Sequence, residues 1–183
     1  MATPGADVIN LEGAFAERDL WPSTGWCRME RALEVVGTKS AMLIVRELFY
    51  GGSRFDELAR RTGLSDAVAS GRLKQLHADG LVEQRPYQDP GKRTRKEYVL
   101  TERGRALYPL LVALMQWGEG VRDDHDTGVE LVHVGCGASL EATVRCADGH
   151  DVSLGEAGAR LKDERLASAL REESRQSRGR EAP

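Results

Sequence analysis

The central part of the chain carries apolar residues at the spacing of an amphipathic helix. They predict a helix over residues 66–78 whose inward stripe consists of Ala69, Leu73 and Leu76. Ser65, directly before this helix, is a suitable N-cap, and Gly63 supplies the positive φ that ends a preceding helix over residues 56–61. Two helices joined by such a tight turn predict a helix-turn-helix motif.

After Gly80 the helical spacing gives way to an alternation of apolar and polar residues. The segment 81–87, LVEQRPY, predicts one strand, and the segment 98–101, YVLT, predicts a second. Between them, GKRTRK at 91–96 holds four cations in six residues with no acid. A basic hairpin directly after a helix-turn-helix indicates a wing, whose tip is placed to contact phosphates or a minor groove.

Further helices are predicted on both sides of this motif. A short helix covers residues 27–36, and the next begins after Thr38 and is apolar almost all round, which favours burial at the centre of the domain. A long helix begins after Thr101 and extends to residue 122, with a kink expected at Pro109. Its apolar stripe consists of Leu107, Leu110, Leu111, Leu114 and Met115. We expect this stripe to form a two-fold dimer interface; alternatively, it folds back onto its own domain.

The two ends of the chain predict smaller, less regular parts. The expected N-terminal arm covers residues 1–26, and the winged domain with its dimerisation helix covers residues 27–122. A C-terminal extension is expected over residues 129–176, followed by a disordered tail over residues 177–183. A short helix is expected near residues 11–19, two strands joined around residues 137–139, and a polar helix over 157–175. The expected fold class is mainly α with a small β wing (α+β): a winged helix-turn-helix with a small C-terminal β-hairpin and helix appendage.

The charge is unevenly distributed along the chain, although the total is only −3. Residues 39–96 hold twelve Lys and Arg against seven Asp and Glu, whereas residues 119–130 hold five acids and one base. Local charge, rather than the total, steers a protein to phosphate. The central segment is therefore the part expected to bind nucleic acid.

The side chains expected to contact double-stranded DNA lie on the second helix of the motif, on the wing and at Lys39. Ser65, Ser70 and Lys74 would enter the major groove, and Asp66 would accept a hydrogen bond from cytosine N4. The wing cations would bind the backbone or a minor groove, and they are Arg93, Arg95 and Lys96. Lys39 would bind a phosphate. The alternative is an ordinary surface helix beside a solvated hairpin tip.

Thiols and imidazoles supply the remaining candidate chemistry. No apolar run approaches the roughly 18 residues of a membrane span, and the N-terminus lacks the order of a signal peptide, so a cytoplasmic protein is expected. In that compartment three cysteines argue against a disulfide framework. Cys27 opens a helix, whose dipole favours the thiolate. It is a candidate redox sensor or, alternatively, a small buried residue at a dimer interface.

A second cluster near the C-terminus reads H-x2-C-x9-C-x3-H and consists of His133, Cys136, Cys146 and His150. Two such pairs on a small hairpin would supply the four ligands of a tetrahedral, structural zinc ion. The spacing is not that of a standard zinc finger. A metal-free hairpin and a hairpin disulfide therefore stay open as alternatives, and no other cofactor is expected.

Residues 27–118 resemble the HxlR-type winged helix-turn-helix regulators, which are relatives of the MarR regulators. The segments that carry the resemblance are CRMERALEVVGTK, LIVRELFYGG, RFDELARRTGLS, RLKQLHADGLVEQRPY and EYVLTERGRALYPLLVALMQWG. The sequence departs from the family pattern at Ser40, where Trp is usual, and at Gly71, where a polar residue is usual. Arg72 matches the family's RL pair, which implies that it supports the helix by an ion pair or reaches a phosphate.

The resemblance implies a cytoplasmic homodimeric transcription regulator that binds an inverted-repeat operator, often as a repressor. In some members the cysteine at the position of Cys27 senses oxidants, so the effector would be an oxidant or a small molecule. A competing interpretation is a protein-interaction module that uses the winged helix as a scaffold without specific DNA binding. An enzyme is disfavoured, because the sequence pairs no nucleophile with a base and has no phosphate-cradling glycine loop.

Overall fold

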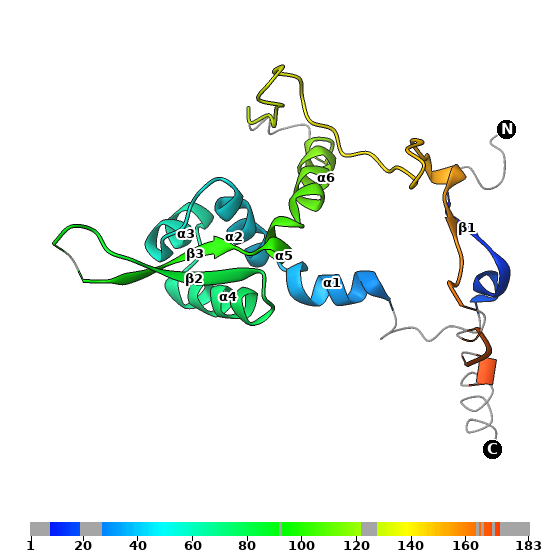
Figure 1. The fold of residues 1–183 in the computed structure, drawn as a ribbon, viewed down its shortest axis with the longest axis horizontal. Coiled ribbons are helices and arrows are strands. Elements are labelled where there is room, and N and C mark those ends of the chain that lie inside the picture. Colours follow the sequence, from blue (N-terminus) through cyan, green and yellow to red (C-terminus); the bar gives the residue numbers. More distant parts are fainter. Residues whose placement is uncertain are drawn as a thin grey trace. The chain divides into compact units, whose positions relative to one another are not determined.

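The computed structural model describes residues 8–18, 27–91, 93–121 and 128–163, together with the isolated positions 165, 167–169 and 171–172. The chain divides into two compact units (Figure 1). One unit is Cys27–Ala142, and the other combines residues 1–26 with residues 143–183. The extension expected at 129–176 is thus shared between the two units. The tail expected at 177–183 and most of the N-terminal arm lie outside the described residues.

Unit 27–142 contains six helices and one hairpin among its described residues. The helices are α1 (Arg28–Val36), α2 (Lys39–Phe49), α3 (Phe55–Thr62), α4 (Asp66–Ala78), α5 (Glu102–Arg105) and α6 (Tyr108–Glu119). The hairpin pairs β2 (Val82–Tyr87) with β3 (Arg95–Leu100) in antiparallel order. This element order confirms the mainly α winged helix-turn-helix expected from the sequence.

Helix α2 lies at the centre of the core, as its all-round apolar pattern predicts. Ala41, Ile44 and Val45 are fully buried, and the Thr38 side chain caps the helix by accepting from the Ala41 N–H at 3.2 Å. Glu47 is also buried. Its carboxylate accepts a hydrogen bond from the neighbouring Arg46 at 2.7 Å, so the buried negative charge is paired with a positive one.

The helix-turn-helix has the bounds and caps that the sequence predicts. Gly63 ends α3 with φ +67°, and the Ser65 hydroxyl accepts from the Val68 N–H at the start of α4. The stripe of Ala69, Leu73 and Leu76 is completely buried. Truncation of either leucine to alanine in such a site costs about 2–5 kcal/mol, so this stripe fixes how α4 sits on the core.

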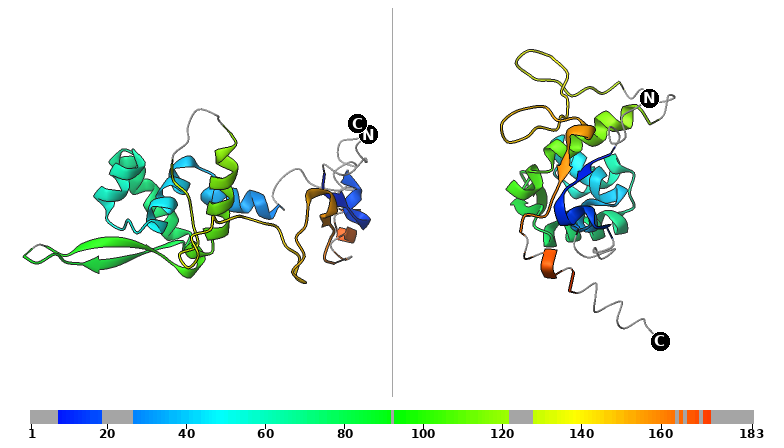
Figure 2. Two further views of the ribbon diagram at one scale, coloured as in Figure 1. Left: turned by 90° about the horizontal axis from the view of Figure 1, so that it is seen from above. Right: turned by 90° about the vertical axis from the view of Figure 1, so that its right-hand side faces the viewer.

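The wing differs from the prediction in where its strands begin. Arg95 and Lys96 were expected at the hairpin tip, but they lie in β3, opposite Tyr87 and Pro86. Cross-strand pairing therefore extends further toward the tip than the apolar alternation indicates. The left view of Figure 2 shows the hairpin extending well beyond the helices of its unit.

The helix expected from Thr101 to residue 122 is two helices. Thr101 caps α5 as predicted, but the chain turns at Ala106 and Leu107 before α6 begins. Pro109 lies in the first turn of α6, where a missing N–H removes no helical hydrogen bond. The proline therefore starts a helix instead of kinking one.

The other unit contains little regular structure among its described residues. Asn10–Leu11 (β1) pair in parallel with Gly158–Ala159 (β4), and Gly13–Ala16 (η1) form a short 3₁₀ helix. The short helix expected near residues 11–19 is thus a 3₁₀ helix and shorter than expected, and the polar helix expected from residue 157 cannot begin before β4 ends. A second 3₁₀ turn, Leu154–Glu156 (η3), has a capping box in which hydrogen bonds from Ser153 lower the pKa of Glu156.

The prediction of a C-terminal hairpin is also wrong in detail. Instead of two strands joined around residues 137–139, the structure has two separate turns. One is closed by a bridge between Val132 and Ser139, and the other by a bridge between Arg145 and Asp151. The second turn also carries an ion pair between these two side chains at 2.6 Å.

A glycine in α5 gives a stability prediction. A Cβ added at Gly104 would lie 2.1 Å from the Leu81 carbonyl oxygen, which belongs to the backbone leading into the wing. Gly104→Ala should therefore lower the free energy of unfolding by about 2–3 kcal/mol, as measured by urea denaturation.

The matched control is Gly71→Ala, also within a helix, because no atom lies within 4 Å of the added Cβ. This change should raise the free energy of unfolding by about 0.5–1 kcal/mol. Equal effects of the two substitutions would contradict the close packing inferred at Gly104.

Candidate nucleic-acid interface

Helix α4 presents a free face opposite its buried stripe. Ser65, Asp66 and Lys74 are exposed there, and Ser70 is half-buried. Gly71 also lies on this face, with open space where a side chain would stand. Small and hydroxyl-bearing residues let the backbone of α4 approach a groove closely, and Lys74 can bond to a base edge or a phosphate.

Polar contacts tie α4 to the start of α2. The Arg72 Nε donates to the Ser40 hydroxyl at 3.2 Å, and that hydroxyl lies 3.3 Å from the Thr38 hydroxyl. The ion pair expected for Arg72 is thus replaced by a hydrogen bond to the serine that departs from the family pattern. Lys39 is exposed beside this contact. Lys39 is therefore next in sequence to the serine that binds Arg72, and the phosphate contacts expected of both residues stay predictions.

The outer part of the wing is held by Arg54, which the sequence analysis did not select as a site residue. Its guanidinium donates to both oxygens of Asp89, at 2.8 and 3.4 Å, and lies 4.6 Å from the centroid of the Tyr87 ring. Its backbone forms an isolated bridge with Glu97. The residue before α3 therefore contacts both strands of the wing and the loop between them.

The backbone of the neighbouring residue reinforces this attachment. The Tyr98 N–H donates to the Ser53 carbonyl at 2.8 Å, and the Ser53 hydroxyl donates to the Glu97 carboxylate at 3.3 Å. The sequence does carry a signal for this bridge, since Arg54 and Phe55 can form a short strand beside the wing. The acidic partner in the loop could not be foreseen, because it lies 35 residues away.

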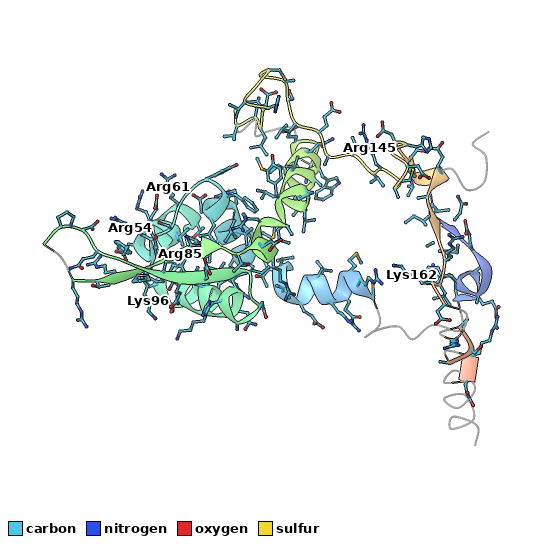
Figure 3. All side chains as sticks on the ribbon, in the orientation of Figure 1. Arg54, Arg61, Arg85, Lys96, Arg145 and Lys162 are labelled. Carbon is cyan, nitrogen blue, oxygen red and sulfur yellow. The ribbon has the colours of Figure 1, made fainter. Side chains whose placement is uncertain are left out.

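The wing cations expected to bind phosphate are exposed, and Lys96 is labelled in Figure 3. Arg93 belongs to the loop, whereas Arg95 and Lys96 project from β3. Arg95 lies 3.8 Å from the Asp56 carboxylate, and both side chains are mostly exposed. This ion pair is weak and does not prevent Arg95 from binding a phosphate.

Cys27 is the N-cap residue of α1, as expected, and its side chain is half-buried. All three cysteines of the chain lie among the described residues, and all are free thiols. The hairpin disulfide considered for Cys136 and Cys146 is therefore absent from this structure.

The residues of the zinc prediction come together as two pairs. His133 Nδ1 lies 3.2 Å from the Cys136 sulfur, and His150 Nδ1 lies 3.4 Å from the Cys146 sulfur. The first pair belongs to unit 27–142 and the second to the other unit. Within the part of the chain that the structure describes, no group of three or more such ligands is gathered in one place.

Helix α6 carries its apolar residues on two faces. Leu111 is buried in the unit's own core and Leu107 packs against it, so this half of the expected dimer stripe folds back. The other residues, Leu110, Leu114 and Trp117, follow helical spacing and are 40%, 43% and 72% exposed. The fold-back alternative therefore holds for Leu107 and Leu111, whereas a dimer interface stays a prediction for the exposed residues.

The buried stripe of α4, its free face and the attached basic hairpin define a winged helix-turn-helix protein that binds nucleic acid. The chain belongs to the HxlR-like helix-turn-helix family, whose model matches residues 35–126. It is 42% identical over 118 residues to the HTH-type transcriptional regulator Rv3095 of Mycobacterium tuberculosis, covering 63% of this chain and 73% of that protein. It is 33% identical to the HTH-type transcriptional regulator YybR of Bacillus subtilis, covering 58% and 85%.

Solved structures give the same assignment. The crystal structure of PA1607, assigned as a transcription factor, is similar with a TM-score of 0.67 and 34% identity, and the match covers 76% of this chain and 97% of that chain. A second protein with that assignment, PA1374 of Pseudomonas aeruginosa, has a TM-score of 0.54 and 30% identity, with 78% and 99% covered. The chain is thus a transcriptional regulator of the helix-turn-helix type, and its relatives are regulators rather than enzymes. Among the helices of the described residues, none has the length and apolarity needed to cross a bilayer.

The attachment of the wing predicts two distinguishable kinds of variant. Lys96→Ala should remove one phosphate contact and reduce the slope of log affinity against log salt by about 0.9. Arg54→Ala should weaken DNA binding with little change in this slope, because its guanidinium is engaged by Asp89 and acts by holding the wing. Both are measured by fluorescence anisotropy with duplex DNA across a salt series.

Arg61→Ala is the control for loss of one positive charge. Arg61 is 52% exposed against 49% for Arg54, and it is likewise paired with a carboxylate, that of Glu57 at 3.1 Å. An equal drop in affinity for the Arg54 and Arg61 variants would show that charge, and not the position of the wing, explains the effect.

Proposed function

We propose that this protein is a homodimeric repressor that binds an inverted-repeat operator. The observation that carries the proposal is the pairing of a free, small-residue face on α4 with exposed cations on β3 of the same unit. The face suits base contacts in a major groove, and the cations suit the flanking backbone. A protein-interaction scaffold would need neither feature.

The dimer is supported by the exposed apolar surface near α6. Leu110, Leu114 and Trp117 form a stripe along this helix, and Met29 and Leu33 are similarly exposed on α1. Exposed apolar side chains at helical spacing are typical of a surface that is covered by another subunit. A dimer paired through α6 about a two-fold axis would carry two copies of α4, one for each half-site of an inverted-repeat operator.

The operator prediction is tested by footprinting purified protein on genomic fragments that include its own promoter. We expect protection of an inverted repeat, with half-site centres about one helical turn apart and affinity that falls steeply with salt. Leu114→Glu should leave the unit folded but convert the dimer to a monomer in analytical ultracentrifugation and weaken operator binding. Weak binding that is equal on all fragments would favour the interaction-scaffold alternative.

The effector is proposed to be an oxidant that acts through Cys27, the half-buried residue at the N-cap position of α1. In the same footprinting experiment, oxidised wild-type protein should lose protection that oxidised Cys27→Ser protein keeps. Unchanged footprints with Cys27 shown to be modified would leave the cysteine as a structural residue.

Structural zinc at His133, Cys136, Cys146 and His150 stays a prediction from the sequence, because the structure gives these residues as two separate pairs. Elemental analysis tests it: about one zinc per chain, lost in His133→Ala and in Cys146→Ser, would support the prediction. Metal-free protein from zinc-supplemented cells would contradict it.

A further inference from the structure

A pocket of about 280 Å³ lies between α6 and the segment 129–141, entirely within unit 27–142. Val112 on α6 forms part of its lining and is 7% exposed, and Leu131 and Leu140 from the two arms of the segment complete an apolar surface. The volume is just below the ~300 Å³ at which the range for small-molecule sites begins. The pocket is therefore large enough for a compact organic molecule.

Hydrogen bonds hold the walls of this pocket in place. The Ala142 N–H donates to the Gln116 side-chain oxygen at 2.8 Å, which attaches the end of the segment to α6. The Leu140 N–H donates to the Leu131 carbonyl at 2.8 Å, which joins the two arms. Because both walls are tied to each other and to α6, the pocket is preformed and a ligand would not have to order it.

The charges of the lining all have one sign. Glu119, Glu130 and Glu141 contribute carboxylates, and no lysine or arginine is among the lining residues. Glu130 accepts a hydrogen bond from the Ser139 hydroxyl, and within the described part of the chain none of the three carboxylates forms an ion pair with a cation. An anionic ligand would be repelled here, whereas a cationic one would be attracted.

We propose that this pocket binds a compact organic cation with an apolar body, such as a substituted quaternary ammonium ion. The apolar body would cover Val112, Leu131 and Leu140, and the cationic centre would lie toward the carboxylates at the rim. The proposal goes beyond the proposed repressor function. It rests only on α6 and the segment 129–141, so it can fail while operator binding is confirmed.

The test is isothermal titration of the full chain with phenyltrimethylammonium and with tert-butylbenzene, its uncharged carbon isostere. We expect one cation to bind per chain, at least about tenfold more tightly than the isostere. Glu119→Gln combined with Glu141→Gln should weaken cation binding about tenfold, since each exposed charge contributes modestly. The affinity for the isostere should stay unchanged in this double variant.

The control combines Glu34→Gln with Glu102→Gln, which removes the same charge at two exposed positions outside the pocket lining. This control should bind the cation as the wild type does. The inference is overturned if the cation does not bind at millimolar concentrations, if it binds no better than the isostere, or if both double variants lose affinity equally. Thermal unfolding of the two double variants verifies that they are folded.

Discussion

The burial of one face of α4 against α2 is the constraint on which the rest of the DNA-binding unit depends. Ala69, Leu73 and Leu76 are fully enclosed, so α4 can present only its opposite face to a ligand. Losing any large part of this stripe would cost several kcal/mol, which is a substantial share of the stability of a small domain. The specificity of the surface is therefore a consequence of the core behind it.

The wing is likewise positioned by its contacts with the domain, and in its case many of these contacts are polar. Beyond its base, the hairpin has few apolar side chains to hold it, and Ser53 and Arg54 supply backbone and ionic attachments there. The planar guanidinium serves this role because it can stack its face on an aromatic ring while its edge donates hydrogen bonds to a carboxylate. Since Arg54 also precedes α3, the wing and the helix-turn-helix are positioned by one short piece of chain.

The sequence was most informative where structure is local. Capping by Thr38, Ser65 and Thr101, and the periodicity of α4, depend on residues only a few positions apart, and the structure confirms them. The pairing of β1 with β4 joins two-residue segments almost 150 positions apart, and neither carries a detectable period. The pocket beside α6 likewise could not be predicted from the sequence, because it depends on the fold of segment 129–141. The proposed DNA contacts could be predicted from the helix-turn-helix motif alone. Their residues remain predictions, although the surfaces that carry them are now described.

Helix α6 brings the two proposed interactions of this protein into one rigid element. The stripe proposed to meet a second copy includes Leu110, Leu114 and Trp117, whereas the pocket uses Val112, Gln116 and Glu119. At 100° per residue these two sets project from roughly opposite sides of the helix. A ligand in the pocket would therefore not compete with a second subunit for the same side chains. Any effect of a bound cation on dimerisation would have to pass through a shift of α6 itself, because a ligand changes an equilibrium only by binding its two states differently.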